Sequence, residues 1–117
     1  MTKTLQQALV QELETVQELW RQEKYSTAFT HLETAHVLGQ RYFLWHLRIH
    51  FWMLRVGWAQ KDGREIRGQL WRLLLTPLGH LTGRLPIGNT GGANISAFKP
   101  MPIPKKLQAI LVQERES

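Results

Sequence analysis

The segment from Phe43 to Trp58 is apolar at nearly every position, which indicates a helix packed against a core. Its polar exceptions include Arg48 and Arg55, which share one narrow stripe at about 100° per residue, and His46 and His50, which stack one turn apart on the opposite face. Because arginine favours water, the arginines face outward and the histidines face the core. A buried polar group without a partner costs about 1–3 kcal/mol. This histidine pair therefore needs hydrogen-bond partners or a metal ion.

The spacing of apolar residues predicts an all-α protein, built as an antiparallel bundle of about four helices over residues 4–82. Asp62 and Glu65 match a capping box, and the loops between the helices are short, which favours antiparallel neighbours. The expected helices are Leu5–Gln22 with Thr4 as N-cap, Ser26–Leu38 ended by Gly39, Tyr42–Gln60, and a fourth that follows Asp62 and ends near Leu75, before Pro77.

Residues 83–104 have a different character, because they lack a helical period and are rich in Gly, Asn and Pro. Apolar residues recur through the stretch, so we expect an ordered, irregular strap laid across the bundle. A short C-terminal helix is expected at about 105–114. A chain of 117 residues is expected to form one domain.

Two of the other predicted helices also direct metal-ligand side chains inward. Glu33 and His36 are three residues apart and share a helix face, a spacing that carboxylate-bridged metal bundles use. Glu12 falls within the apolar arc of the first helix, where a charged carboxylate costs several kcal/mol unless it is paired.

The three helices together predict a site for a divalent transition metal, with Zn or Fe as the first candidates. The predicted ligands are Glu12, Glu33, His36, His46 and His50. Such a protein would serve metal homeostasis or act as a small metalloenzyme in which a carboxylate is the base or a bridging ligand. The alternative is a metal-free buried polar network, and the sequence leaves open whether the protein is an enzyme.

Three other features indicate a function less strongly. His80 follows the expected helix end at Pro77, so it is expected in a loop rather than among the ligands. The run Gly88–Gly92 could form a backbone nest for an anion, although tight turns explain its glycines equally well. Glu65 is explained by the capping box.

The net charge of +6 permits contact with nucleic acid or an acidic protein. As an alternative function, the chain would be a non-catalytic interaction module, with a basic face of Arg41, Arg48, Arg55, Arg64 and Arg67. A homodimer that buries part of a Trp-rich surface is a further possibility. The chain has no cysteine, no signal-peptide pattern and no run of 18 apolar residues, so we expect a cytoplasmic protein without a membrane span.

Two motifs resemble those of a family of small bacterial proteins known only as a domain of unknown function. They are the helix His31-Leu32-Glu33-Thr34-Ala35-His36 with His46 and His50 downstream, and the tail from Gly88-Asn89-Thr90-Gly91-Gly92 to Pro100-Met101-Pro102-Ile103-Pro104. The resemblance runs from about the first helix to Pro104 and implies no catalytic residue. It implies metal handling by association, because members are often encoded near heavy-metal resistance and efflux genes.

Overall fold

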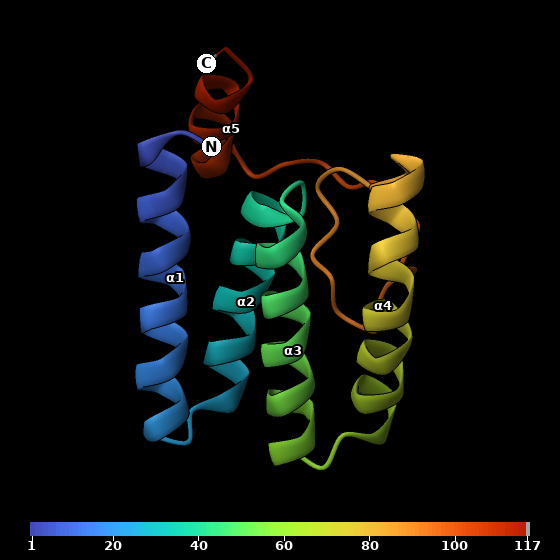
Figure 1. The fold of residues 1–117 in the computed structure, drawn as a ribbon. Coiled ribbons are helices and arrows are strands. Elements are labelled where there is room, and N and C mark those ends of the chain that lie inside the picture. Colours follow the sequence, from blue (N-terminus) through green and yellow to red (C-terminus); the bar gives the residue numbers. More distant parts are fainter. Residues whose placement is uncertain (117) are drawn as a thin grey trace.

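The computed structural model describes residues 1–116 and shows an all-helical protein, with no strand among these residues. The prediction of an all-α fold is confirmed. From α1 to α4 the helices run alternately down and up in Figure 1, and each packs mainly on the next along the chain, while α5 packs on α1. The helices are α1 (Lys3–Arg21), α2 (Tyr25–Gly39), α3 (Phe43–Ala59), α4 (Gly63–Thr82) and α5 (Lys105–Glu116).

The apolar core lies where α1, α2 and α3 meet. Every member of its α1 stripe is at least nine-tenths buried, and the stripe repeats at intervals of three and four residues, as an amphipathic helix requires. The core residues are Leu5, Leu9, Leu13 and Val16 from α1, Ala28, Leu32, Ala35, Val37 and Leu38 from α2, Ile49, Met53 and Val56 from α3, and Leu107 from α5. Thr2, rather than Thr4, caps α1, because the Thr2 hydroxyl accepts a hydrogen bond from the Leu5 N–H at 3.2 Å.

Helix α4 continues through Pro77 to Thr82, so the expected end near Leu75 is wrong. A proline inside a helix costs about 3 kcal/mol of stability. Pro77 is exposed, and the preceding turns of α4 are held by hydrogen bonds from Gln69 and Arg72 to carbonyls within residues 83–104. Gly83 caps the end of the helix, and its φ of 74° suits glycine. The expected N-cap is confirmed, because Asp62 Oδ1 accepts from the Glu65 N–H at 3.1 Å.

Residues 83–104, called the strap from here on, contain no helix or strand and pass beside α3 and α4 in Figure 1. The side chain of Asn89 organises this segment. Its Nδ2 donates to the carbonyls of Ser96 at 2.9 Å and Lys99 at 2.7 Å, and its Oδ1 accepts from the Gly91 N–H at 2.8 Å. Asn89 is only 2% exposed, so the strap has a buried, hydrogen-bonded centre of its own.

No helix in the described part of the chain is both long enough and apolar enough to span a membrane.

Candidate metal centre

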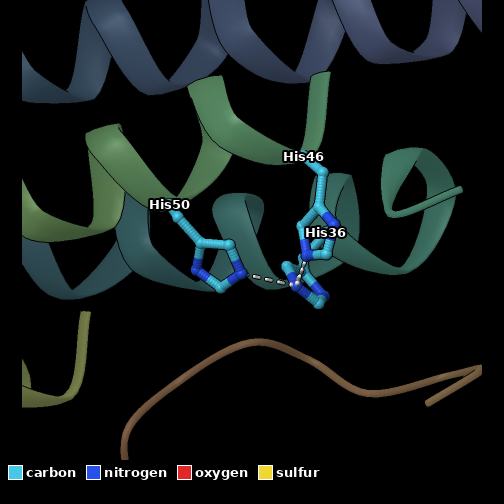
Figure 2. Close-up of side chains that lie close together, drawn as sticks. All are labelled: His36, His46 and His50. Carbon is cyan, nitrogen blue, oxygen red and sulfur yellow. Dashed lines mark hydrogen bonds between the residues drawn. The ribbon is translucent and has the colours of Figure 1, made fainter. Parts of the chain in front are cut away.

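Three buried histidines bring their ring nitrogens together beside the strap (Figure 2). His36 comes from α2, and His46 and His50 come from successive turns of α3. The Nε2 atom of His36 lies 3.0 Å from that of His46 and 3.0 Å from that of His50. The three residues are 3%, 5% and 2% exposed, respectively.

The short connection between α2 and α3 places the three rings. It reverses the chain within Gln40–Tyr42, so that the last turn of α2 lies against the first turns of α3. Gly39 permits the close approach, because a Cβ there would lie 3.1 Å from the side chain of Leu9 and 3.3 Å from that of Ile49. The i, i+4 spacing of His46 and His50 then directs both rings to the same point.

Each of the three rings is oriented through its other nitrogen. His36 Nδ1 donates to the Asn89 carbonyl at 2.6 Å, and His50 Nδ1 donates to Gln69 Oε1 at 2.6 Å. His46 Nδ1 lies 2.9 Å from His80 Nε2. Histidines that bind metals almost always have such a partner on the nitrogen that does not touch the metal.

These partners fix where the protons of His36 and His50 lie. A carbonyl oxygen can only accept, so His36 Nδ1 carries a proton. The amide of Gln69 is oriented because its Nε2 donates to Glu65 Oε2 at 2.7 Å and to the Gly91 carbonyl at 2.9 Å, so its Oε1 accepts from His50. In the neutral rings, therefore, the Nε2 atoms of His36 and His50 are both bare acceptors, and their lone pairs face each other at 3.0 Å.

Protonation does not relieve this contact at neutral pH. Burial lowers the pKa of His36 well below its ordinary value, and the nearby His50, His46 and Arg72 lower it further. Burial, His50 and His80 lower the pKa of His46 to about 3, and burial lowers that of His50 to about 4. The rings are neutral at pH 7, so the two converging lone pairs have no proton between them, and a metal cation could satisfy both.

The spacing of the ligand atoms is close to what a metal requires. Nitrogens bound tetrahedrally at about 2.0–2.1 Å lie about 3.3 Å from one another, and the three ligand nitrogens here lie within 4.8 Å of one another. The buried cluster of His36, His46 and His50 could hold a metal ion.

A cavity of about 410 Å³ adjoins the cluster. All three histidines line it, together with Gln40, Arg72 and Arg84 and a largely apolar remainder. No acidic side chain is among its lining residues in the described chain.

Of the five predicted ligands, the structure brings together the three histidines and leaves out the two glutamates. Glu12 pairs with His31 instead, at 2.7 Å, on the face where α1 meets α2. Glu33 lies half-buried; burial and the nearby Glu65 raise its pKa, while a hydrogen bond from Thr90 opposes this. Neither belongs to the grouped residues, and we leave both out of the metal site proposed below.

Sequence reasoning missed the residues that orient the rings. His80 is not in a loop, because α4 extends past it, and Gln69 lies about three turns earlier on the same face of that helix. This spacing would have revealed both partners if the helix had been extended through Pro77. The Glu65 carboxylate does not close the expected capping box, because it accepts from the Ala93 N–H at 3.0 Å and from Gln69, while the Asp62 N–H donates to the Gly57 carbonyl.

Fold and site together define a small all-helical protein with a buried three-histidine cluster that adjoins a cavity. The chain belongs to the family described as "Protein of unknown function (DUF3703)", whose model matches residues 3–111. This confirms the resemblance to a domain of unknown function. No curated protein and no solved structure matches the chain.

Proposed function

We propose that the protein binds one divalent transition metal ion through the Nε2 atoms of His36, His46 and His50. One observation carries the proposal: two bare nitrogen lone pairs face each other at 3.0 Å inside the protein. His46 can take either tautomer, because His80 can donate to its Nδ1 or accept from it. Even if His46 donates to His36, the Nε2 of His50 still lacks a proton donor. A cation bound by all three nitrogens satisfies every ring at once.

The donor set favours Zn²⁺. Imidazole nitrogens suit Zn, Cu, Fe and Ni, whereas the common non-haem iron site adds a carboxylate to two histidines. The cluster contains three histidines and no carboxylate among the described residues. We therefore place Zn²⁺ ahead of Fe²⁺ as the metal.

A centre with three protein ligands leaves a fourth position for an exchangeable ligand, as in catalytic zinc sites rather than structural ones. The cavity beside the histidines supports this assignment, because it provides room for water or a small molecule next to the metal. The centre would thus serve reversible ligand or metal exchange, or metal-assisted chemistry on a bound molecule.

Elemental analysis of protein purified without a histidine tag or chelator tests the proposal. We expect about one metal per chain in the wild type, and loss of that metal in His46→Ala and His50→Ala. His31→Ala is the matched control, because His31 is a half-exposed histidine paired with Glu12, and it should keep its metal. Circular dichroism checks that each variant remains helical.

A second measurement is needed in case the variants fail to fold. Co²⁺ added to the metal-free wild type should give the intense visible bands of a four-coordinate nitrogen site. A wild type that binds neither Co²⁺ nor Zn²⁺ would overturn the proposal. The histidines would then be a buried polar network, and the basic face would become the leading candidate for function.

A further inference from the structure

The wall of the cavity beside the three histidines is cationic. Arg72 lines it and is only 8% exposed, and Arg84 lies at the same cavity. A guanidinium that leaves water needs an acceptor for each donor or an anionic partner. Arg72 donates two hydrogen bonds to backbone carbonyls, from Nη1 to Gly68 at 3.1 Å and from Nη2 to Ile95 at 2.6 Å. Its buried Nε has no hydrogen-bond partner.

No acidic side chain among the described residues lines this wall. Burial lowers the pKa of Arg72 and the nearby charge of Glu65 raises it, while the Glu65 carboxylate also accepts hydrogen bonds from the Ala93 N–H and from Gln69. Even where Glu65 offsets the charge of Arg72, three neutral imidazoles leave the full charge of a divalent ion uncompensated. A loaded site therefore attracts an anion strongly, because opposite charges interact far more in a buried pocket than in water.

The other residues that line the cavity indicate the chemistry of the uncharged part of that anion. Leu75, Leu85 and Phe98 make much of the wall apolar, and a volume of about 410 Å³ is within the range of small-molecule sites. Gln40 adds a buried Oε1 without a partner, while its Nε2 donates to the Pro86 carbonyl at 3.0 Å. An inorganic anion would leave the apolar wall empty, whereas a small organic anion fills it.

We propose that this cavity binds a small organic carboxylate, with its charged end held between Arg72 and the metal and its apolar part against the leucine and phenylalanine side chains. The planar guanidinium suits a carboxylate because the two groups match in shape and charge. This inference rests on the proposed metal site, and it names the class of molecule that the site takes.

Calorimetric titration of the Zn²⁺-loaded protein with hexanoate tests the inference, with hexanamide as the neutral analogue. Hexanoate should bind, and hexanamide should bind at least about tenfold more weakly. Arg72→Gln should weaken hexanoate by a similar factor while the metal content stays at one per chain. Arg67→Gln removes the same charge from an exposed position on α4 and should leave binding unchanged.

The outcomes separate this inference from the metal proposal. Metal-loaded wild type that does not bind hexanoate, or that binds hexanamide equally well, overturns the carboxylate site and leaves the metal site intact. Equal weakening by Arg67→Gln would attribute the effect to overall charge and also overturn it. If Arg72→Gln does not fold, Arg72→Lys keeps the charge but loses the planar fork, and it should still weaken hexanoate. If the protein binds no metal, the metal proposal fails by itself, and titration of the metal-free protein tests Arg72 alone.

A second inference comes from a different face of the molecule. Helix α3 exposes Leu44, Phe51 and Trp58 by 73%, 53% and 70%, with half-buried Leu47 and Leu54 between them. These five residues repeat at alternating intervals of three and four, which is the heptad pattern of a helix–helix seam.

Helix α4 carries a similar stripe of Leu70, Leu74 and Leu81, exposed by 54%, 64% and 83%. Helices α3 and α4 are neighbours that run in opposite directions in Figure 1. At about 100° per residue, each stripe lies roughly a quarter-turn or more around its helix from the side chains at the histidine cluster. Each exposed side chain presents on the order of 100 Å². The six exposed side chains of the two stripes therefore present roughly 600 Å², about three-quarters of the about 800 Å² per partner of a standard interface.

We infer that a second copy of the chain covers this face, so that α3 and α4 of two protomers form a four-helix seam. Sedimentation velocity should show a dimer for the wild type. Phe51→Lys and Leu74→Lys place a charge in the seam and should give monomers. Ile87→Lys adds the same charge at a strap residue that is 65% exposed and should leave the dimer intact. A monomeric wild type would overturn the inference, and binding of that monomer to anionic vesicles would assign the face to a membrane surface instead.

Discussion

Replacing Gly91 by alanine tests whether the strap positions the metal ligands. Gly91 has a φ of 86°, where an L-residue costs roughly 1–2 kcal/mol. A Cβ there would also lie 2.5 Å from His36 Cδ2 and 2.9 Å from His36 Nε2, well inside the ordinary carbon contact of about 3.5–4.0 Å. The ring or the strap must therefore move by about 1 Å, and overpacking of this kind costs about 1–3 kcal/mol more.

The matched control is Gly83→Ala. Gly83 has a similar φ of 74°, but a Cβ there would meet nothing within 4 Å. The control therefore isolates the backbone cost, and the difference between the two variants measures the contact with His36.

Urea unfolding of the metal-free proteins should show a loss of about 2–5 kcal/mol for Gly91→Ala and about 1–2 kcal/mol for Gly83→Ala. Chelator competition should show metal affinity lowered about 10–100-fold in Gly91→Ala, because a displaced ligand loses its orientation, and unchanged affinity in Gly83→Ala. Equal affinities in the two variants would refute the argument that the strap sets the position of His36.

Three further predictions concern the partners of the cluster, its protonation and a remote cap. Gln69→Leu leaves His50 Nδ1 without its acceptor, so unfolding should lose about 1–3 kcal/mol and metal affinity should fall about 10–100-fold in the same two assays. The pKa of His46 is about 3 and that of His50 about 4, so protons compete with the metal for these nitrogens only at low pH. Metal affinity should therefore stay constant from pH 8 to about 5. Histidines of ordinary pKa would make the affinity fall below about pH 6.5. Asp62→Ala removes the cap of α4 and should cost about 1 kcal/mol of stability with no change in metal content.

Local patterns were enough to predict the helices and the inward direction of the histidines. The period of α3 is set by its own residues, so the opposition of His46 and His50 to Arg48 and Arg55 could be read directly from the chain. The arginines do lie outside the buried core, since Arg48 is exposed and Arg55 is half-buried, each over the ring of a tryptophan that packs against the core, at 5.0 Å from the Trp45 ring centre and 4.2 Å from that of Trp52.

The identity of partners across helices could not be read in this way. Glu12 and His36 both lie on inward arcs of their helices, but only packing decides that Glu12 meets His31 on the neighbouring flank. The Asn89 carbonyl that orients His36 is a backbone group, and every residue type carries one, so no sequence signal marks it. His80 could not be identified for a different reason, since a proline usually ends a helix, whereas α4 continues through Pro77 to Thr82.

One series of hydrogen bonds joins the strap to His50, a proposed metal ligand, and it predicts that bound metal stabilises the strap. The Ala93 N–H donates to Glu65, Gln69 donates to Glu65 and to the Gly91 carbonyl, and Gln69 accepts from His50. A metal that fixes the His50 ring also fixes Gln69 and thus the strap. Zn²⁺ should therefore slow amide hydrogen exchange in a peptide spanning 88–96, while a peptide from the middle of α1 serves as the control. Equal hydrogen exchange with and without bound metal would show that the strap is ordered by Asn89 alone. It would also show that these hydrogen bonds do not couple the metal to the strap.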